Sequence, residues 1–180
     1  MICIVYFSGT GHTRMLAQAV AEGAEEVQLI DVEAMGPEDW VALDAAEAII
    51  FGAPTYMGST AARFDMFLEE AASRWDTGLW ADKVAAGFTV AVHPSGDKMN
   101  ALVRLAVFAA QMGMIWVGQS EIGAPVKPER EGINRDGSWL GLMATDPVSE
   151  GDKATARLFG ARVAGASARW AAGGCKVAHA

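Results

Sequence analysis

Short apolar runs that alternate with helical patterns are the feature that most constrains the fold of this chain. Runs such as AIIFGAP are apolar throughout, which is typical of strands in a parallel sheet that is covered on both faces. Because parallel neighbours need crossover connections, the sequence predicts an α/β fold of three layers with a five-stranded parallel sheet. The expected strands are Ile2–Phe7, Val27–Val32, Ala48–Pro54, Lys83–Val92 and Met114–Gly118.

Helical periodicity appears between and after these runs. It predicts helices over His12–Gly23, over a segment ending near Trp75, over Asp97–Gln111 and over Glu150–Trp170. Some thirty residues between Gly118 and Glu150, rich in Gly, Pro and charge, are expected to form a functional or partly disordered loop. No repeat or linker divides the chain, so a single domain over residues 1–180 is expected.

Composition excludes several classes of function. The chain carries a net charge of −8 and has no cluster of lysine and arginine, which argues against nucleic-acid or anionic-membrane partners. Its two cysteines, Cys3 and Cys175, are too few for a disulfide framework and lack the spacing of a metal site. No signal peptide or membrane-spanning stretch is recognisable, so a soluble cytoplasmic protein is expected.

Three unusual loops follow strands whose carboxyl ends should lie at one edge of the sheet. They read SGTGHT after the first strand, PTYMGS after the third and HPSGDK after the fourth. Ligands of open parallel sheets bind at this edge, where the strand order reverses. The candidate contacts are Ser8, Gly9, Thr10, Gly11, His12, Thr13, Pro54, Thr55, Tyr56, Met57, Gly58, Val92, His93, Pro94, Ser95 and Gly96.

The first loop has the composition of a phosphate site. It combines hydroxyl side chains, the N–H groups of Gly9–Thr13 and the positive end of a helix dipole. No lysine follows Gly11, so the triphosphate-binding P-loop is absent, and Arg14 breaks the dinucleotide fingerprint. A phosphate monoester fits best. The alternative is an ordinary turn in which Ser8 or Thr10 caps the helix.

The other two loops suit a flat ring beyond that phosphate. Tyr56 and Met57 can pack against such a ring, while His93 could hydrogen-bond a reduced flavin or a quinone, or simply face water. His12 could donate to the phosphate or be a solvated surface residue. A phosphate at one end with aromatic and apolar contacts beyond it describes flavin mononucleotide (FMN).

These motifs together resemble a known family. SGTGHT matches the flavodoxin phosphate pattern, and its combination with AVAEGA, AIIFGAPTYMGS, FLEE, GMIWVG and DGSW is similar to the flavodoxin-like NAD(P)H:quinone oxidoreductases of the tryptophan-repressor-binding-protein type. The resemblance implies a flavodoxin-like sheet of order 2-1-3-4-5. It implies that Ser8–Thr13 hold the FMN phosphate, that Pro54–Gly58 and Val92–Gly96 contact the isoalloxazine, and that Trp75 flanks the substrate pocket.

The chain departs from this family at the flavin edge. It has HPSGDK where relatives carry a loop rich in Gly and Thr, and Met112 where they carry a histidine; the segment Glu33–Glu47 is also short. Separately, only Arg104 is polar between Ala101 and Ala110, so that helix must bury more than one face. We expect a homo-oligomer, a dimer or tetramer, that uses this helix; the alternative is burial under the loop at 118–150.

The expected function is therefore an FMN-dependent oxidoreductase. Electrons would pass from NADH or NADPH through FMN to a quinone or to free flavin, and since the cofactor carries the chemistry no catalytic side chain is assigned. One alternative is a flavodoxin-type one-electron carrier that docks through an acidic surface, which agrees with the net charge. Another is a flavin-free phosphate-binding or signalling module of the same fold.

Overall fold

A mostly parallel sheet with helices on both faces forms the body of the protein. The computed structural model describes residues 1–173, so Cys175 lies outside the described part. The sheet has the order β2-β1-β3-β5, and two short strands complete the edge beside β5. The strands are β1 Ile2–Tyr6, β2 Val27–Asp31, β3 Ala48–Tyr56, β4 Ser59–Thr60, β5 Val84–Ala91, β6 Ile115–Trp116 and β7 Leu142–Thr145.

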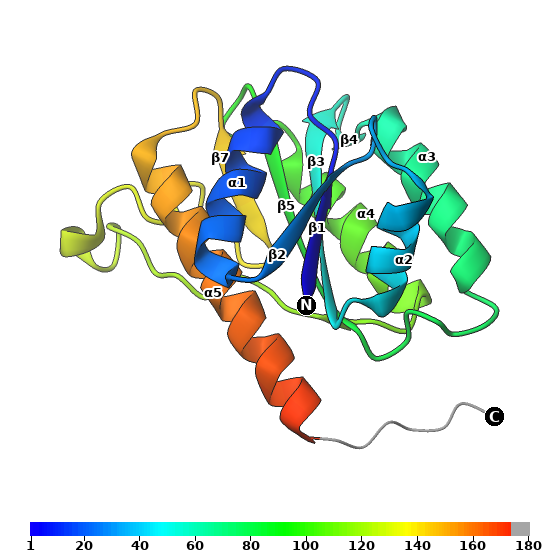
Figure 1. Ribbon diagram of the computed structural model, residues 1–180. Coiled ribbons are helices and arrows are strands. Elements are labelled where there is room, and N and C mark those ends of the chain that lie inside the picture. Colours follow the sequence, from blue (N-terminus) through cyan, green and yellow to red (C-terminus); the bar gives the residue numbers. More distant parts are fainter. Residues whose placement is uncertain (174–180) are drawn as a thin grey trace.

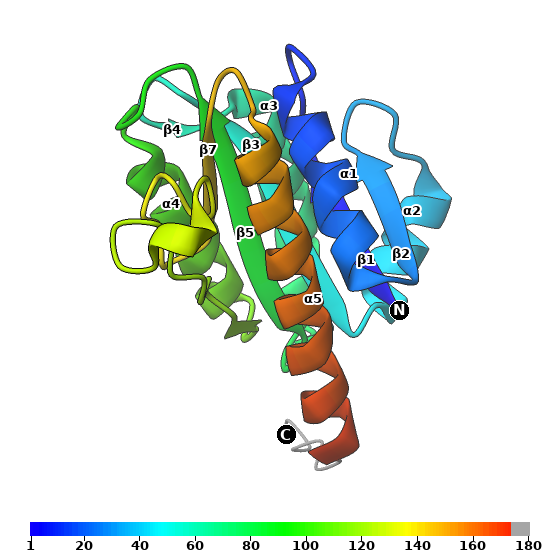
Figure 2. The same ribbon diagram turned by 90° about the vertical axis from the view of Figure 1, so that its left-hand side faces the viewer.

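Helices cover the sheet on both sides, as Figure 1 and Figure 2 show. The apolar residues of α1 and α5 pack on one face, and those of α2, α3 and α4 pack on the other. The helices are α1 His12–Ala24, α2 Pro37–Ala45, α3 Ala62–Ala71, α4 Lys98–Gln111 and α5 Glu150–Gly173, with 3-10 turns at Ala72–Arg74 and Pro128–Arg130. The predicted three-layer α/β fold and its strand order are confirmed.

The strand count differs from the prediction at the edge beside β5. The fifth position of the sheet is shared by β6, which pairs with the start of β5, and β7, which pairs with its end; both run parallel to it. The chain leaves the sheet after Val117 and returns at Leu142, so the predicted loop at 118–150 in fact contains a strand. A strand of four residues is too short for its periodicity to stand out. The additional β4 is a two-residue antiparallel partner of β3.

Close contact between α1 and α5 depends on glycine. A Cβ atom on Gly160 of α5 would collide with the carbonyl oxygen of Val20, and one on Gly23 of α1 would collide with that of Arg157. Backbone approach of this kind leaves no room for any side chain. The two helices therefore lie side by side as Figure 2 shows, α1 against β1 and β3 and α5 against β5 and β7, and the position of α1 fixes the loop that precedes it.

A buried ion pair ties the segment between β6 and β7 to the rest of the fold. The side chain of Lys98, at the start of α4, is 1% exposed and contacts that of Asp136, which is 6% exposed. The ammonium group also donates to Thr145 Oγ1 at 2.7 Å and to the Ala144 carbonyl at 3.2 Å. Every donor of the lysine thus has a partner in the interior. The contact joins α4, β7 and the intervening segment.

The outer face of α4 stays open. Met99, Val103 and Val107 are between 43% and 50% exposed, whereas Leu102, Leu105 and Phe108 are buried. The predicted alternative, that the segment at 118–150 buries this helix on all sides, is therefore wrong. The homo-oligomer stays a prediction. None of the helices within residues 1–173 is both long enough and apolar enough to span a membrane.

Substitution of Gly160 by alanine tests the helix contact. We expect Gly160→Ala to lower the free energy of unfolding by about 2 kcal/mol or more, because the methyl group must push α1 away. The matched control is Gly165→Ala in the same helix, where the new Cβ would meet only the flexible Arg169 side chain at 3.5 Å. There the helix propensity of alanine should give about 0.5–1 kcal/mol of stabilisation. Urea unfolding measures both; equal effects would contradict the close packing.

Substitution of Lys98 tests the buried pair. We expect Lys98→Met to cost about 3–5 kcal/mol of stability, because the Asp136 carboxylate is left buried without a counter-charge. Lys98→Met combined with Asp136→Asn should recover part of this loss. The control is Lys153→Met, whose partner Glu150 is 81% exposed, and it should change the urea midpoint little. A midpoint for Lys98→Met equal to that of the control would refute the structural role.

Candidate functional site

The three predicted loops lie together at the carboxyl edge of the sheet, at the top of Figure 1. Parallel pairing sets this arrangement, since Tyr6 of β1 is in register with Gly52 of β3, and Pro54 of β3 with Val90 of β5. The loops also lie close to one another. A Cβ on Gly9 would lie 2.5 Å from the Tyr56 hydroxyl, and one on Gly58 would lie 3.8 Å from the Asp97 Cβ.

The first loop presents free backbone donors. Residue Gly11 precedes α1 with a φ of 97° and has no side chain with which to cap the helix. Ser8 Oγ accepts the N–H of Arg14, the third residue of α1, at 3.1 Å, so the Ser8 hydroxyl does make the capping hydrogen bond of the structural alternative. Thr10 makes no such bond among the described residues. Among the described residues, the N–H groups of Gly9 to Thr13 donate no hydrogen bond. Orphan donors at a helix start are the elements of an anion site.

A hairpin forms the second loop. Strands β3 and β4 are joined by Met57 and Gly58, with φ angles of 50° and 80°, as a tight hairpin of the primed type requires. Met57 is fully exposed and Tyr56 is 46% exposed, which leaves both side chains accessible to a ligand. Pro54 is buried. The Thr55 hydroxyl, also buried, hydrogen-bonds Thr89 at 2.7 Å. A left-handed backbone at a non-glycine tip residue is typical of functional sites.

The third loop is open to solvent. Val92 is 67% exposed, and residues 93–95 are exposed as well. Gly96 has a φ of 53°, and Asp97, with the same φ, precedes α4. The loop therefore ends at a helix start, as the first loop does. It carries no aromatic side chain.

A fourth segment at this edge was missed by the sequence analysis. Asp146 follows β7, donates its N–H to the Ala91 carbonyl at 2.9 Å, and places Oδ1 3.2 Å from His12 Nδ1. It was missed because residues 118–150 were interpreted as a loop. The apolar run LMAT followed by Asp-Pro was the available signal, since a short apolar run bounded by turn residues is typical of a strand.

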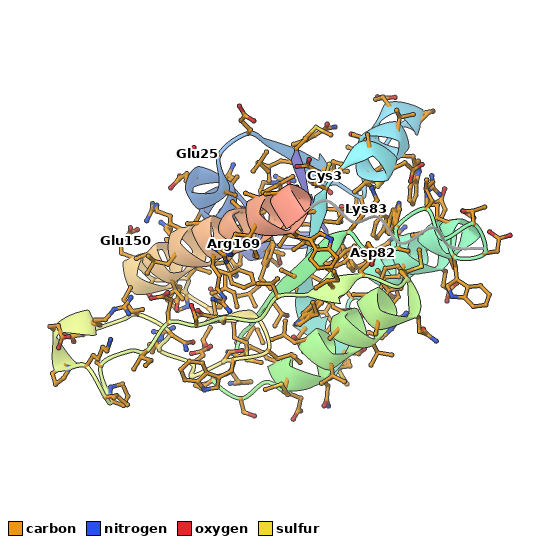
Figure 3. All side chains as sticks on the ribbon, turned by 90° about the horizontal axis from the view of Figure 1, so that it is seen from below. Cys3, Glu25, Asp82, Lys83, Glu150 and Arg169 are labelled. Atoms are coloured by element: carbon orange, nitrogen blue, oxygen red, sulfur yellow. The ribbon has the colours of Figure 1, made fainter. Side chains whose placement is uncertain are left out.

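Basic side chains near the first loop face carboxylates. Arg14 Nη2 lies 2.8 Å from Asp31 Oδ2, and the hydrogen bond that the guanidinium donates to this carboxylate raises the pKa of Arg14. His12 faces Asp146. Elsewhere, Cys3 lies in the interior (Figure 3), where burial raises the pKa of its thiol to about 11. That thiol is not a nucleophile for chemistry at this edge.

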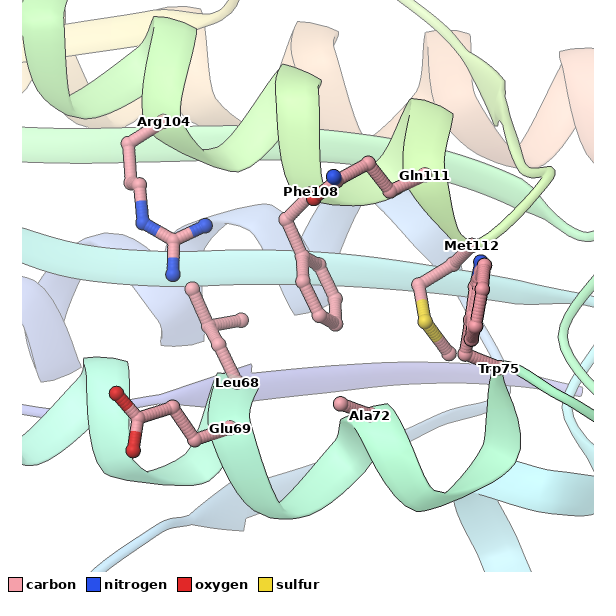
Figure 4. Close-up of a pocket in the computed structure, with 8 residues that line it drawn as sticks. All are labelled: Leu68, Glu69, Ala72, Trp75, Arg104, Phe108, Gln111 and Met112. Carbon is pink, nitrogen blue, oxygen red and sulfur yellow. The ribbon is translucent and has the colours of Figure 1, made fainter.

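The structure separates Trp75 from the loop cluster. Trp75 is 63% exposed, and it follows α3 at the amino edge of the sheet, opposite the first loop. With Leu68, Ala72, Phe108 and Met112 it lines an open groove of about 330 Å³ between α3 and α4, shown in Figure 4. Glu69 and Arg104 also line it. Within one chain, Trp75 cannot flank a ligand held by the three loops.

A doubly wound sheet with free backbone donors at the point where the strand order reverses is the arrangement in which open α/β sheets bind nucleotide cofactors. A family model described as flavodoxin domain matches residues 3–113. The flavodoxin FldP of Pseudomonas aeruginosa (strain UCBPP-PA14) is 40% identical over 172 residues, covering 89% of this chain and 93% of that protein. The chain therefore belongs to the flavodoxin domain family.

Other relatives carry enzyme names. An NAD(P)H dehydrogenase (quinone) of Archaeoglobus fulgidus is 29% identical over 192 residues, covering 91% of this chain and 95% of that one. Among solved structures, a flavodoxin, WrbA-like protein from Agrobacterium tumefaciens superposes with a TM-score of 0.79 at 40% identity, covering 93% of this chain and 97% of that one. These similarities support an oxidoreductase that is a flavoprotein.

The residues present fit the flavin that this family implies. The N–H groups of Gly9–Thr13 are free, and a Cβ placed on Gly11 would meet no atom within 4 Å, so the space over the loop is open to a phosphate. Tyr56 and Met57 stand exposed beside it. FMN would thus be held by the loop backbone at its phosphate and by the hairpin along its ring.

Substitution of Gly11 tests this fit. Alanine at a φ of 97° is strained, so Gly11→Ala should shift the loop and weaken FMN binding by about tenfold or more. Gly137→Ala is the matched control, because Gly137 also has a positive φ with open space around it but lies in the segment between β6 and β7. Titration of FMN fluorescence measures both. Equal FMN affinities for the two variants would count against the loop as the phosphate site.

Proposed function

We propose that this protein is an FMN-dependent oxidoreductase that passes electrons from NADH or NADPH to a quinone or to free flavin. The observation that carries the proposal is the open, non-aromatic third loop. Val92 and His93 lie exposed beside the hairpin, and no aromatic side chain of that loop is placed to cover a flavin ring. One face of the ring is then accessible to a flat nicotinamide or quinone.

The chain's own residues have holding and shielding roles in this reaction. The N–H groups of Gly9–Thr13 bind the phosphate, Tyr56 and Met57 pack against the ring, and the loop at Val92–Gly96 borders the substrate side. When bound, FMN supplies the hydride-accepting chemistry. No side chain has to act as acid or base in a hydride transfer, so donor and acceptor can use one pocket in turn. His93 is the side chain best placed to hydrogen-bond a quinone oxygen.

Relatives supply independent support for the enzyme. The Archaeoglobus fulgidus protein is named for quinone reduction, and its similarity extends over nearly the whole of both chains. Exposed apolar residues on α4, with the groove that contains Trp75, support a homo-oligomer. In such an assembly Trp75 would serve the site of a neighbouring copy, since it cannot reach the site of its own chain.

A one-electron carrier is the second candidate. It is favoured by the 40% identity to a protein named flavodoxin and by the net charge of −8, which suits docking to basic redox partners. The two functions differ in how the bound flavin is reduced. A carrier separates the two electrons into distinct steps, whereas a hydride-accepting enzyme takes them together.

Steady-state turnover tests the proposal. FMN-loaded protein with NADH or NADPH and benzoquinone should oxidise the pyridine nucleotide catalytically, at a rate proportional to protein concentration. The control is the Gly11→Ala variant, which should lose turnover in proportion to its lost FMN. The carrier would be established instead if the protein bound FMN but did not oxidise NAD(P)H, and if a reductive titration showed two separated one-electron steps. Protein that leaves FMN fluorescence unquenched would favour a flavin-free module.

A further inference from the structure

A contact between a histidine and a carboxylate joins the first loop to a part of the chain far away in sequence. His12 is the first residue of α1, and its Nδ1 lies 3.2 Å from Oδ1 of Asp146, at the end of β7. The two side chains are only 29% and 30% exposed. Asp146 is fixed in turn, because its N–H donates to the Ala91 carbonyl at 2.9 Å. The carboxylate is therefore held in place from the third-loop side of the site.

The chemistry of this contact determines what His12 can offer a phosphate. A carboxylate only accepts hydrogen bonds, so Nδ1 is the ring nitrogen that faces an acceptor. The other ring nitrogen is Nε2, and a phosphate oxygen also only accepts. With its Nδ1 side turned to Asp146, the imidazole has Nε2 left to offer to an anion at the loop.

Other cations around the loop are already engaged. Arg14 is paired with Asp31 across the end of β2, Lys98 is buried against Asp136, and Lys153 of α5 is paired with Glu150. The loop itself has no lysine. Within the described residues, His12 is thus the basic side chain of the first loop that Asp146 can direct to an anion bound by the free N–H groups.

We propose that Asp146 is a positioning residue of the phosphate site, which acts through His12. Its carboxylate faces Nδ1 and orients the imidazole so that Nε2 donates to the phosphate monoester. This inference rests on the FMN binding in the proposed function, and not on the electron donor or acceptor. The segment between β7 and α5, which is not one of the three predicted loops, thereby has a role in ligand recognition.

Flavin titrations with and without a phosphate test the assignment. Asp146→Asn should weaken FMN binding by about tenfold, the size expected for loss of one charge-assisted hydrogen bond. It should leave the affinity for riboflavin unchanged, because riboflavin lacks the phosphate. His12→Asn should cause the same loss, and the double variant should lose no more than either single variant. Asp31→Asn is the matched control, since it removes the carboxylate that faces the loop's other cation, and it should cause no loss of FMN affinity.

Several outcomes would overturn the assignment. A merely structural role would lower FMN and riboflavin affinity equally in Asp146→Asn, so that their ratio would not change. If the Asp146 carboxylate only repelled the phosphate, Asp146→Asn would bind FMN more tightly than the wild-type protein. Failure of the proposed electron transfer is distinguishable, because these titrations contain neither NAD(P)H nor quinone. Suppose that the wild-type protein binds FMN and that Asp146→Asn changes the ratio of FMN to riboflavin affinity, but that the wild-type protein fails to oxidise NAD(P)H. That result would support the role of Asp146 and reject the enzyme.

Discussion

Parallel pairing of strands that are buried on both faces is the constraint on which the rest of this structure depends. Residues Ile4, Val5, Ile50 and Phe51 are fully buried, and successive side chains point into opposite helical layers. Such strands can be neighbours only through crossover helices. The carboxyl ends of all the parallel strands then lie at one edge of the sheet, together with the loops that follow them. The candidate site is a consequence of this arrangement.

What that edge offers a ligand is mostly backbone. The first loop has free N–H groups at Gly9 to Thr13, and the Ser8 hydroxyl engages only the N–H of Arg14. Its basic side chains, Arg14 and His12, each face a carboxylate, that of Asp31 or of Asp146. In the proposed function, a phosphate would therefore be recognised mainly by hydrogen-bond geometry. A strong positive field, such as a lysine would give, is absent from the loop.

Much of this could be predicted from sequence because local patterns and topology agree. Continuous apolar strands gave the α/β class, and the rule that parallel strand ends share an edge brought Ser8, Tyr56 and His93 together. The split of the fifth strand was not predictable in the same way, since β7 has only four residues and its pairing with β5 is set by tertiary contacts such as the Lys98–Asp136 pair. Because β7 was not predicted, Asp146 at its end was not recognised as a candidate site residue. The role of Trp75 at the substrate pocket came from the family resemblance alone. A helix that begins at the carboxyl edge of the sheet ends at the opposite edge, and Trp75 lies there.

Amide chemical shifts in a ¹⁵N–¹H correlation spectrum test the central claim most directly. On addition of one equivalent of FMN, the account predicts that the amides of Gly9–Thr13 shift most, with smaller shifts at Tyr56–Gly58 and at residues 93–97. Shifts that are absent from the first loop and concentrated in the groove between α3 and α4 would contradict it.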